Sequence, residues 1–160
     1  MGIWGSQVVA VDDDLDTLDL VRAVLREHGA QLVAVSEPGR ALSTVVGVMP
    51  DVLLIDIAMP GEDGLALLRK VRTLSPEKGG RIPAATLTAC LASPERLEEW
   101  RRAGFQRHIA KPFLPDHLVA VVEALAGRVV ERRSRTVASA SWPRDVRRER
   151  RRECRDGLAC

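Results

Sequence analysis

Five short apolar segments constrain the fold of this chain more than any other feature of its sequence. They cover residues 7–11, 31–35, 52–55, 82–88 and 105–110, and each is too short for a stable helix. In the segments between them, apolar residues recur every three or four positions, which is the spacing of an amphipathic helix. Strands that alternate with helices form a parallel sheet with helices on both faces. The pattern therefore predicts an α/β fold with five parallel strands.

Residues typical of helix ends support this division. Gly29 and Gly104 stand where a C-terminal glycine commonly ends a helix, and Ser93 followed by Pro94 is typical of an N-cap and a first helical residue. The expected helices cover residues 15–28, 38–48, 65–74, 94–103 and 115–125.

Polar side chains stand at the ends of four of the expected strands. Asp12 and Asp13 follow the first strand, Asp56 follows the third, Thr88 ends the fourth and Lys111 follows the fifth. Ligands of open parallel sheets bind outside the carboxyl ends of the strands. Taken singly, an aspartate after a strand is more often a turn residue or a helix N-cap than part of a site. Acids after two strands combined with a lysine after a third favour a functional site.

Three carboxylates at one edge of a sheet need compensating positive charge. Two unit charges 4 Å apart repel by about 4 kcal/mol at an effective dielectric constant near 20, so three such pairs approach roughly 10 kcal/mol. Lys111 supplies one positive charge. A hard divalent cation is the second natural source, and Mg²⁺ suits a site with few carboxylates that leaves room for water and a phosphate oxygen.

Four ordered motifs resemble the receiver domain of two-component response regulators, the module exemplified by the bacterial chemotaxis regulator. They are VVAVDDD at 8–14, LIDIAMPGEDG at 54–64, LTA at 87–89, and the stretch from AGF at 103–105 to KPF at 111–113. The resemblance covers about residues 7–126, and its last motif looks like receivers attached to hybrid histidine kinases. It implies a flavodoxin-like, doubly wound sheet with strand order 2-1-3-4-5.

The resemblance also implies a role for each acidic residue. Asp56 accepts a phosphoryl group from a partner histidine kinase or histidine phosphotransfer domain. Asp12, Asp13, Asp56 and the backbone carbonyl of Ala58 hold Mg²⁺ or Mn²⁺. Such a domain is not an enzyme in the usual sense, because it catalyses only its own phosphorylation and dephosphorylation and signals through protein–protein contacts.

Further roles follow from the resemblance for the fourth and fifth strands. Lys111 pairs with a phosphoryl oxygen, and Thr88 donates its hydroxyl to another once the domain switches. The peptide bond between Lys111 and Pro112 is expected to be cis. The second switch residue is His108, where the family usually has Tyr or Phe; a purely structural role for this histidine in its strand remains open.

The helix at 94–103, the strand at 105–110 and the helix at 115–125 are expected to form the signalling face, because both switch residues lie beneath it. Trp100 lies on the first of these helices. Two interpretations of Trp100 remain open. It is either an apolar group that a partner covers, or a residue that packs within the domain.

Two other functional classes remain as alternatives. Asp12, Asp14 and Asp16 nearly match the D-x-D-x-T motif of haloacid-dehalogenase-type phosphatases, but Asp16 stands where that motif requires Thr. A phosphorylation-independent interaction module is the second alternative. Such a module would lose residues of the acidic site, and this chain retains them.

Charge divides the chain into two parts. Up to Ala126 there are 13 basic and 17 acidic residues, whereas from Gly127 onward there are 11 arginines and 5 acidic residues. We expect a receiver domain over residues 1–127 and an Arg-rich, mostly disordered tail over residues 128–160, which has few apolar residues to offset the entropy of ordering. The interspersed acids, and Trp142 as the only aromatic residue of the tail, argue against specific nucleic-acid binding.

The composition favours a cytoplasmic protein with no membrane association. The longest stretch without a charged residue, 82–94, has 13 residues, short of the roughly 20 that a membrane-spanning helix needs. The N-terminus lacks the basic residues of a secretory signal. Three cysteines without C-x-x-C spacing suggest neither a disulfide framework nor a zinc site.

Overall fold

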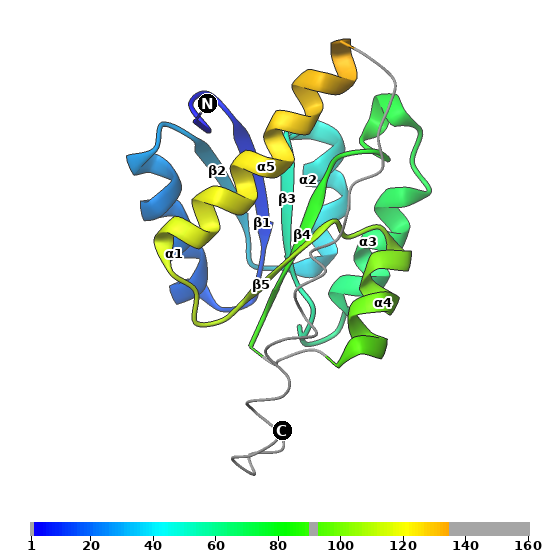
Figure 1. Ribbon diagram of the computed structural model, residues 1–160. Coiled ribbons are helices and arrows are strands. Elements are labelled where there is room, and N and C mark those ends of the chain that lie inside the picture. Colours follow the sequence, from blue (N-terminus) through cyan, green and yellow to red (C-terminus); the bar gives the residue numbers. More distant parts are fainter. Residues whose placement is uncertain (1, 90–92, 135–160) are drawn as a thin grey trace.

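A computed structural model of the chain describes residues 2–89 and 93–134, which form one parallel sheet flanked by helices (Figure 1). The strand order is β2-β1-β3-β4-β5, and every neighbouring pair is parallel. This order confirms the doubly wound α/β fold that the sequence predicts. The strands are β1 (Gln7–Val11), β2 (Gln31–Val35), β3 (Val52–Asp56), β4 (Ala84–Thr88) and β5 (Arg107–Ala110).

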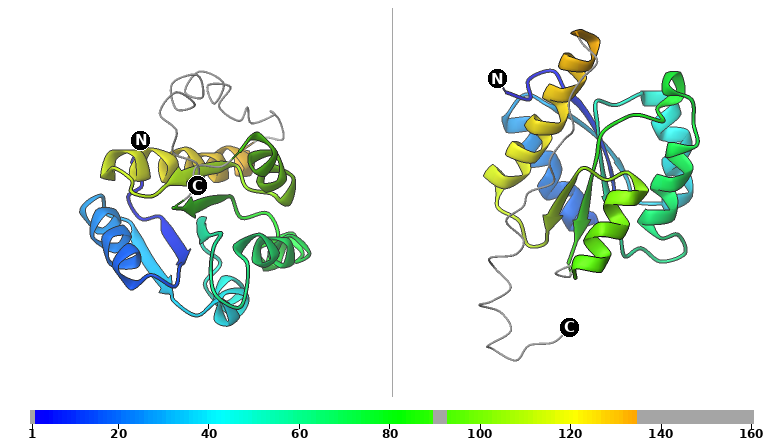
Figure 2. Two further views of the ribbon diagram at one scale, coloured as in Figure 1. Left: turned by 90° about the horizontal axis from the view of Figure 1, so that it is seen from below. Right: turned by 45° about the vertical axis from the view of Figure 1, so that its right-hand side comes forward.

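Helices cover both faces of the sheet. Helices α1 and α5 lie on one face, and α2, α3 and α4 lie on the other, as the view toward the carboxyl ends of the strands shows (Figure 2, left). The α-helices are α1 (Leu15–Glu27), α2 (Ala41–Val48), α3 (Gly64–Arg72), α4 (Pro94–Ala103) and α5 (Pro115–Ser134); the 3₁₀ turns are η1 (Pro38–Arg40) and η2 (Pro76–Lys78).

Two apolar cores explain why the strands are apolar on both sides. Successive side chains of a strand point to opposite faces of its sheet. Val9 and Val11 pack toward α2, α3 and α4, while Val8 and Ala10 pack toward α1 and α5. All residues of β3 and β4 are buried. The central strand β3 therefore holds its last residue, Asp56, in a rigid position.

Several element boundaries differ from the expected ones: β5 begins at Arg107 rather than at residue 105, and α3 ends at Arg72 rather than at residue 74. The expected second helix begins as the 3₁₀ turn η1 before α2. Strand β4 begins at Ala84 rather than at residue 82, because Pro83 has no N–H to donate to a ladder. Helix α5 continues to Ser134, and therefore crosses the boundary expected at residue 127. Residues 128–134, the beginning of the tail expected to be mostly disordered, are therefore helical. The rest of that tail, residues 135–160, lies outside the described residues.

Among residues 2–89 and 93–134, no helix combines the length and the hydropathy that a membrane span requires.

The N-terminal segment contributes a core residue that the sequence pattern does not reveal. Ile3 is 1% exposed and packs in the core beneath α1 and α5. Two backbone hydrogen bonds hold the segment: the Gly5 N–H donates to the Gly29 carbonyl, and the Gln31 N–H donates to the Ser6 carbonyl, both at 2.9 Å. The folded unit therefore begins before β1.

Replacing Ile3 with Ala is expected to lower the free energy of unfolding by about 2 to 5 kcal/mol, because the substitution leaves a cavity in the core. Urea denaturation measures the change. The control is Leu114→Ala at a side chain that is 75% exposed, where we expect a change within about 0.5 kcal/mol. Equal, small effects of both substitutions would show that Ile3 does not belong to the core.

Candidate functional site

Three aspartates meet where β1 and β3 end. The two strands are parallel neighbours, with Val11 in register with Ile55, so the residues that follow, Asp12 and Asp56, lie side by side. Asp12 and Asp56 are buried and Asp13 is exposed, and one carboxylate oxygen from each lies within 4.8 Å of the others. We call these three residues the acidic cluster. The structure thus brings together the acids that the sequence placed at one edge of the sheet.

Lys111 lies against the acidic cluster. Its Nζ donates to Asp12 Oδ2 at 2.6 Å and lies 3.5 Å from Asp56 Oδ2. Its backbone N–H donates to the Thr88 carbonyl at 2.6 Å, which ties the end of β5 to the end of β4. The peptide bond between Lys111 and Pro112 is cis, as predicted. One ammonium group therefore contacts two of the three carboxylates, those of Asp12 and Asp56.

The surroundings of Asp56 perturb its pKa. Burial, followed by the negative charge of Asp12, raises the pKa of Asp56 to about 6, while the positive charge of Lys111 opposes this rise. The backbone N–H of Ala58 also favours the ionised form by donating to Asp56 Oδ1 at 3.2 Å. The cluster accordingly favours added positive charge near Asp56.

The donor set of the acidic cluster fits a hard divalent cation. All candidate ligand atoms are carboxylate oxygens, which Mg²⁺ prefers over nitrogen or sulfur donors. Asp12, Asp13 and Asp56 would hold the ion, with Ala58 in the loop directly after β3. Three carboxylates against Lys111 leave an excess of negative charge that a divalent cation would neutralise.

Replacing Asp56 with Asn is expected to stabilise the protein by about 1 to 3 kcal/mol in EDTA at about pH 8, because Asn removes a charge that burial and Asp12 disfavour. The folded state binds a proton at Asp56 more tightly than the unfolded state does. Wild-type stability therefore falls as the pH rises from about 4 to about 6, and the advantage of Asn grows over the same range.

Urea denaturation at several pH values in EDTA checks this expectation. The control is Asp19→Asn, an exposed position on α1 outside the acidic cluster, which should show no such pH-dependent gain. Mg²⁺ should stabilise the wild type more than Asp56→Asn. A wild type that is as stable as Asp56→Asn at every pH would contradict the inferred repulsion.

The two expected switch residues, Thr88 and His108, lie on neighbouring strands. Thr88 is 4% exposed at the end of β4. His108 is half-buried and in register with Thr86, two residues before Thr88, and its Nδ1 lies 2.9 Å from the Thr86 hydroxyl. Burial, together with the charge of His117, lowers the pKa of His108 and so favours the neutral imidazole.

Thr86 is the residue of this region that the sequence analysis missed. Its side chain is 0% exposed, so its hydroxyl needs a partner within the protein. The available signal was its place two positions before Thr88, because residues two apart on a strand share one face of the sheet. His108 therefore has a structural contact in addition to its expected switch role.

Trp100 packs within the domain rather than on its surface. It is 4% exposed, and its ring centroid lies 5.4 Å from that of His108 at an interplanar angle of 40°. The structure thus decides between the two interpretations of this residue.

Replacing His108 with Phe is expected to lower the free energy of unfolding by about 1 to 3 kcal/mol, since the buried Thr86 hydroxyl loses its partner. The double variant Thr86→Val/His108→Phe should regain part of that loss, because both polar groups are then gone. Urea denaturation of the wild type, the two single variants and the double variant completes the cycle. Strictly additive losses would show that the Thr86–His108 contact does not contribute.

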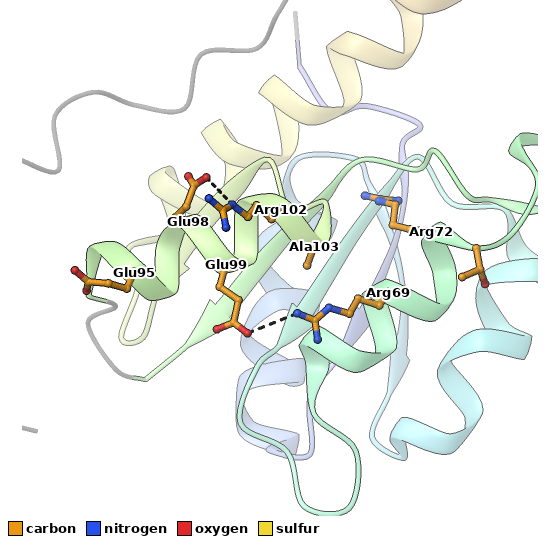
Figure 3. A pocket seen from close by; sticks show the side chains of 8 residues that line it. Arg69, Arg72, Glu95, Glu98, Glu99, Arg102 and Ala103 are labelled. Atoms are coloured by element: carbon orange, nitrogen blue, oxygen red, sulfur yellow. Dashed lines mark hydrogen bonds and ion pairs between the residues drawn. The ribbon is translucent and has the colours of Figure 1, made fainter.

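A hollow of about 700 Å³ lies between α3 and α4 (Figure 3). Members of the acidic cluster do not line it. Two of its arginines are paired within it: Arg69 lies 3.6 Å from Glu99, and Arg102 lies 3.0 Å from Glu98. The Arg69–Glu99 pair bridges α3 and α4, whereas the Arg102–Glu98 pair lies within α4. We therefore attribute the hollow to helix packing.

Comparison with known proteins identifies the class to which this fold and this site belong. Residues 8–123 match the response regulator receiver domain family. The chain therefore belongs to this family, which is a signalling module of two-component systems rather than a class of conventional enzymes. Receiver domains bind Mg²⁺ at an acidic site, in agreement with the acidic cluster.

Curated relatives include a transcriptional regulatory protein. The chain is 38% identical over 116 residues to an uncharacterized 14.6 kDa protein from Leptolyngbya boryana, covering 72% of this chain and 86% of that protein. It is 30% identical over 140 residues to the transcriptional regulatory protein PrrA from Mycobacterium tuberculosis, covering 88% of this chain and 56% of PrrA. The chain thus spans about half the length of that regulator.

Solved structures show the same fold. The receiver domain of the sensor histidine kinase PA1611 from Pseudomonas aeruginosa, with magnesium in its active-site cleft, has a TM-score of 0.69 and 28% identity, covering 77% of this chain and 98% of that one. The chemotaxis protein CheY4 from Vibrio cholerae has a TM-score of 0.69 and 26% identity, covering 75% and 98%. These similarities do not favour the phosphatase alternative.

Proposed function

We propose that Asp56 accepts a phosphoryl group from a phosphohistidine on a partner histidine kinase or histidine phosphotransfer domain. The observation that carries this proposal is the position of Asp56, buried at the end of the central strand beside Asp12 and Lys111. A carboxylate oxygen of Asp56 forms a bond to phosphorus. The phosphorus–nitrogen bond breaks, and the electron pair leaves with the imidazole of the partner.

The other site residues act on charge and orientation. We assign Asp12, Asp13, Asp56 and the Ala58 backbone carbonyl as ligands of Mg²⁺ or Mn²⁺. An ion held by these residues would neutralise charge on the phosphoryl oxygens. Lys111, held by its contacts with Asp12 and Asp56, presents its ammonium group to a phosphoryl oxygen.

Phosphorylation acts as a switch through β4 and β5 in this proposal. The phosphoryl group adds about −1.5 to −2 of charge. The Thr88 hydroxyl donates to one of its oxygens, and His108 changes position together with Thr88. The surface formed by α4, β5 and α5 then changes and signals by protein–protein contact.

The organisation of the whole chain is also a proposal. We assign the receiver domain to residues 1–127 and an Arg-rich appendage to residues 128–160; the buried Ile3 and the family match that ends at residue 123 support this division. We propose a cytoplasmic protein that binds no specific nucleic acid and catalyses only its own phosphorylation and dephosphorylation. Phosphotransfer from a panel of purified histidine kinases identifies the partner.

Acetyl phosphate with Mg²⁺ is expected to phosphorylate the wild type at Asp56, as intact-mass and peptide analysis would show. Asp56→Asn should not be labelled, since it lacks the nucleophilic carboxylate. Lys111→Ala should be labelled about 100-fold more slowly, because it lacks the charge that stabilises the transition state. Asp19→Asn is the matched control and should react like the wild type. Labelling of Asp56→Asn at the wild-type rate would refute the assignment.

Beryllofluoride with Mg²⁺ is expected to change amide hydrogen exchange mainly in α4, β5 and α5, because Thr88 and His108 lie beneath these elements. Mass spectrometry of the peptides measures the change, and Asp56→Asn treated in the same way serves as the control. Changes confined to α1 and α2 would place the signalling face elsewhere.

A further inference from the structure

The first residue of α3, Gly64, lies against the backbone of Asp56. A Cβ atom placed on Gly64 would lie 2.0 Å from the carbonyl oxygen of Asp56 and 2.9 Å from its carbonyl carbon. The Gly64 N–H donates to the Ile57 carbonyl at 3.1 Å, which closes the loop between β3 and α3 at its base. The lack of a side chain lets the start of α3 touch the peptide group of Asp56.

Space, rather than backbone conformation, demands glycine at position 64. Its φ lies outside the left-handed region, and helix propensity by itself favours alanine over glycine. Gly61, in the same loop, is the opposite case: its φ is +86°, and a Cβ there would meet nothing within 4 Å. Of the two glycines, only Gly64 makes a contact that a methyl group would break.

Neither side of the Gly64 contact can yield without moving a buried element. The opposing atoms belong to the backbone of β3, all of whose residues are buried. A third neighbour, Ile55 Cγ2 at 2.9 Å, belongs to a side chain that is 1% exposed. On the other side, α3 is anchored by buried apolar residues, which are Leu65, Leu67, Leu68 and Val71. A methyl group at position 64 must therefore displace the Asp56 peptide or the start of α3.

We infer that Gly64 is a positioning residue for the phosphoacceptor, an inference that rests on the proposed role of Asp56. Its close contact lets α3 hold the Asp56 peptide, from which the carboxylate projects. That carboxylate also accepts from the Ala58 N–H at 3.2 Å, so a displaced peptide moves the carboxylate and the Ala58 segment together. Both belong to the proposed metal and phosphoryl site, where a misplacement of about 1 Å is enough to lower a rate about 100-fold.

Gly80 offers a matched control at a site away from the acidic cluster. A Cβ on Gly80 would also lie 2.0 Å from a backbone carbonyl oxygen, that of Leu74, and 2.9 Å from its carbon. Gly80 is likewise buried, and its φ also lies outside the left-handed region. It follows η2 and precedes β4, at the end of the sheet opposite the acidic cluster. Gly64→Ala and Gly80→Ala therefore introduce the same clash at two different places.

The experiment compares the full-length wild type, Gly64→Ala and Gly80→Ala in trimethylamine N-oxide, which stabilises folded proteins. Urea denaturation in EDTA measures stability, and isothermal titration calorimetry measures the Kd for Mg²⁺. Acetyl phosphate measures the rate of Asp56 phosphorylation without the docking of a kinase. We expect both variants to lose stability. Only Gly64→Ala should bind Mg²⁺ about tenfold more weakly and react about 100-fold more slowly, while Gly80→Ala stays within about twofold of the wild type.

Each other outcome is decisive. A folded Gly64→Ala variant that binds Mg²⁺ and reacts like Gly80→Ala would overturn the positioning role and leave the proposed function intact. An unfolded Gly64→Ala beside a folded Gly80→Ala would assign Gly64 to the fold alone and overturn the positioning role as well. A wild type that neither binds Mg²⁺ nor reacts at Asp56 would overturn the proposed function and this inference together.

Discussion

The parallel pairing of β1 with β3 forces two buried carboxylates into contact range, and the rest of the site depends on this juxtaposition. Val11 and Ile55 are in register, so Asp12 and Asp56 leave the sheet side by side. At a separation of 4 Å and an effective dielectric constant near 20, two such charges repel by about 4 kcal/mol. Lys111 opposes the repulsion through its contacts with both residues. The remaining negative charge is what suits the site to a divalent cation and a phosphoryl group.

The apolar sheet offsets the instability of this arrangement. A whole domain is stable by only about 5 to 15 kcal/mol, so the repulsion within the acidic cluster is a large fraction of the total. Strand β3 compensates because it is buried along its length and packs against apolar cores on both faces. The same burial raises the pKa of Asp56. The packing that stabilises the fold therefore also disfavours the ionised form of Asp56, which a bound cation would favour.

The sequence predicted the sheet, its helices and the convergence of the acidic cluster with Lys111, because these follow from local periodicity and from the ends of parallel strands. It did not reveal contacts that depend on register or on close packing. The pairing of Thr86 with His108 requires the alignment of β4 with β5. Gly64 resembles an ordinary turn glycine until its distance to β3 is known. Ile3 precedes the first periodic segment, and α5 continues beyond the end expected at residue 125.

Strands β4 and β5 connect the acidic cluster to α4 through the contact between Thr86 and His108. Thr88 lies at the end of β4, and Thr86, two residues earlier on the same face, bonds His108, whose ring lies 5.4 Å from that of Trp100. A Phe at position 108 would move away from Thr86 without breaking a hydrogen bond. His108 must give up its contact with a hydroxyl that is 0% exposed, which costs about 1 to 3 kcal/mol if the hydroxyl finds no new partner. Under the proposed function, the charge added at Asp56 must supply that free energy, so the Thr86–His108 contact sets the threshold for switching.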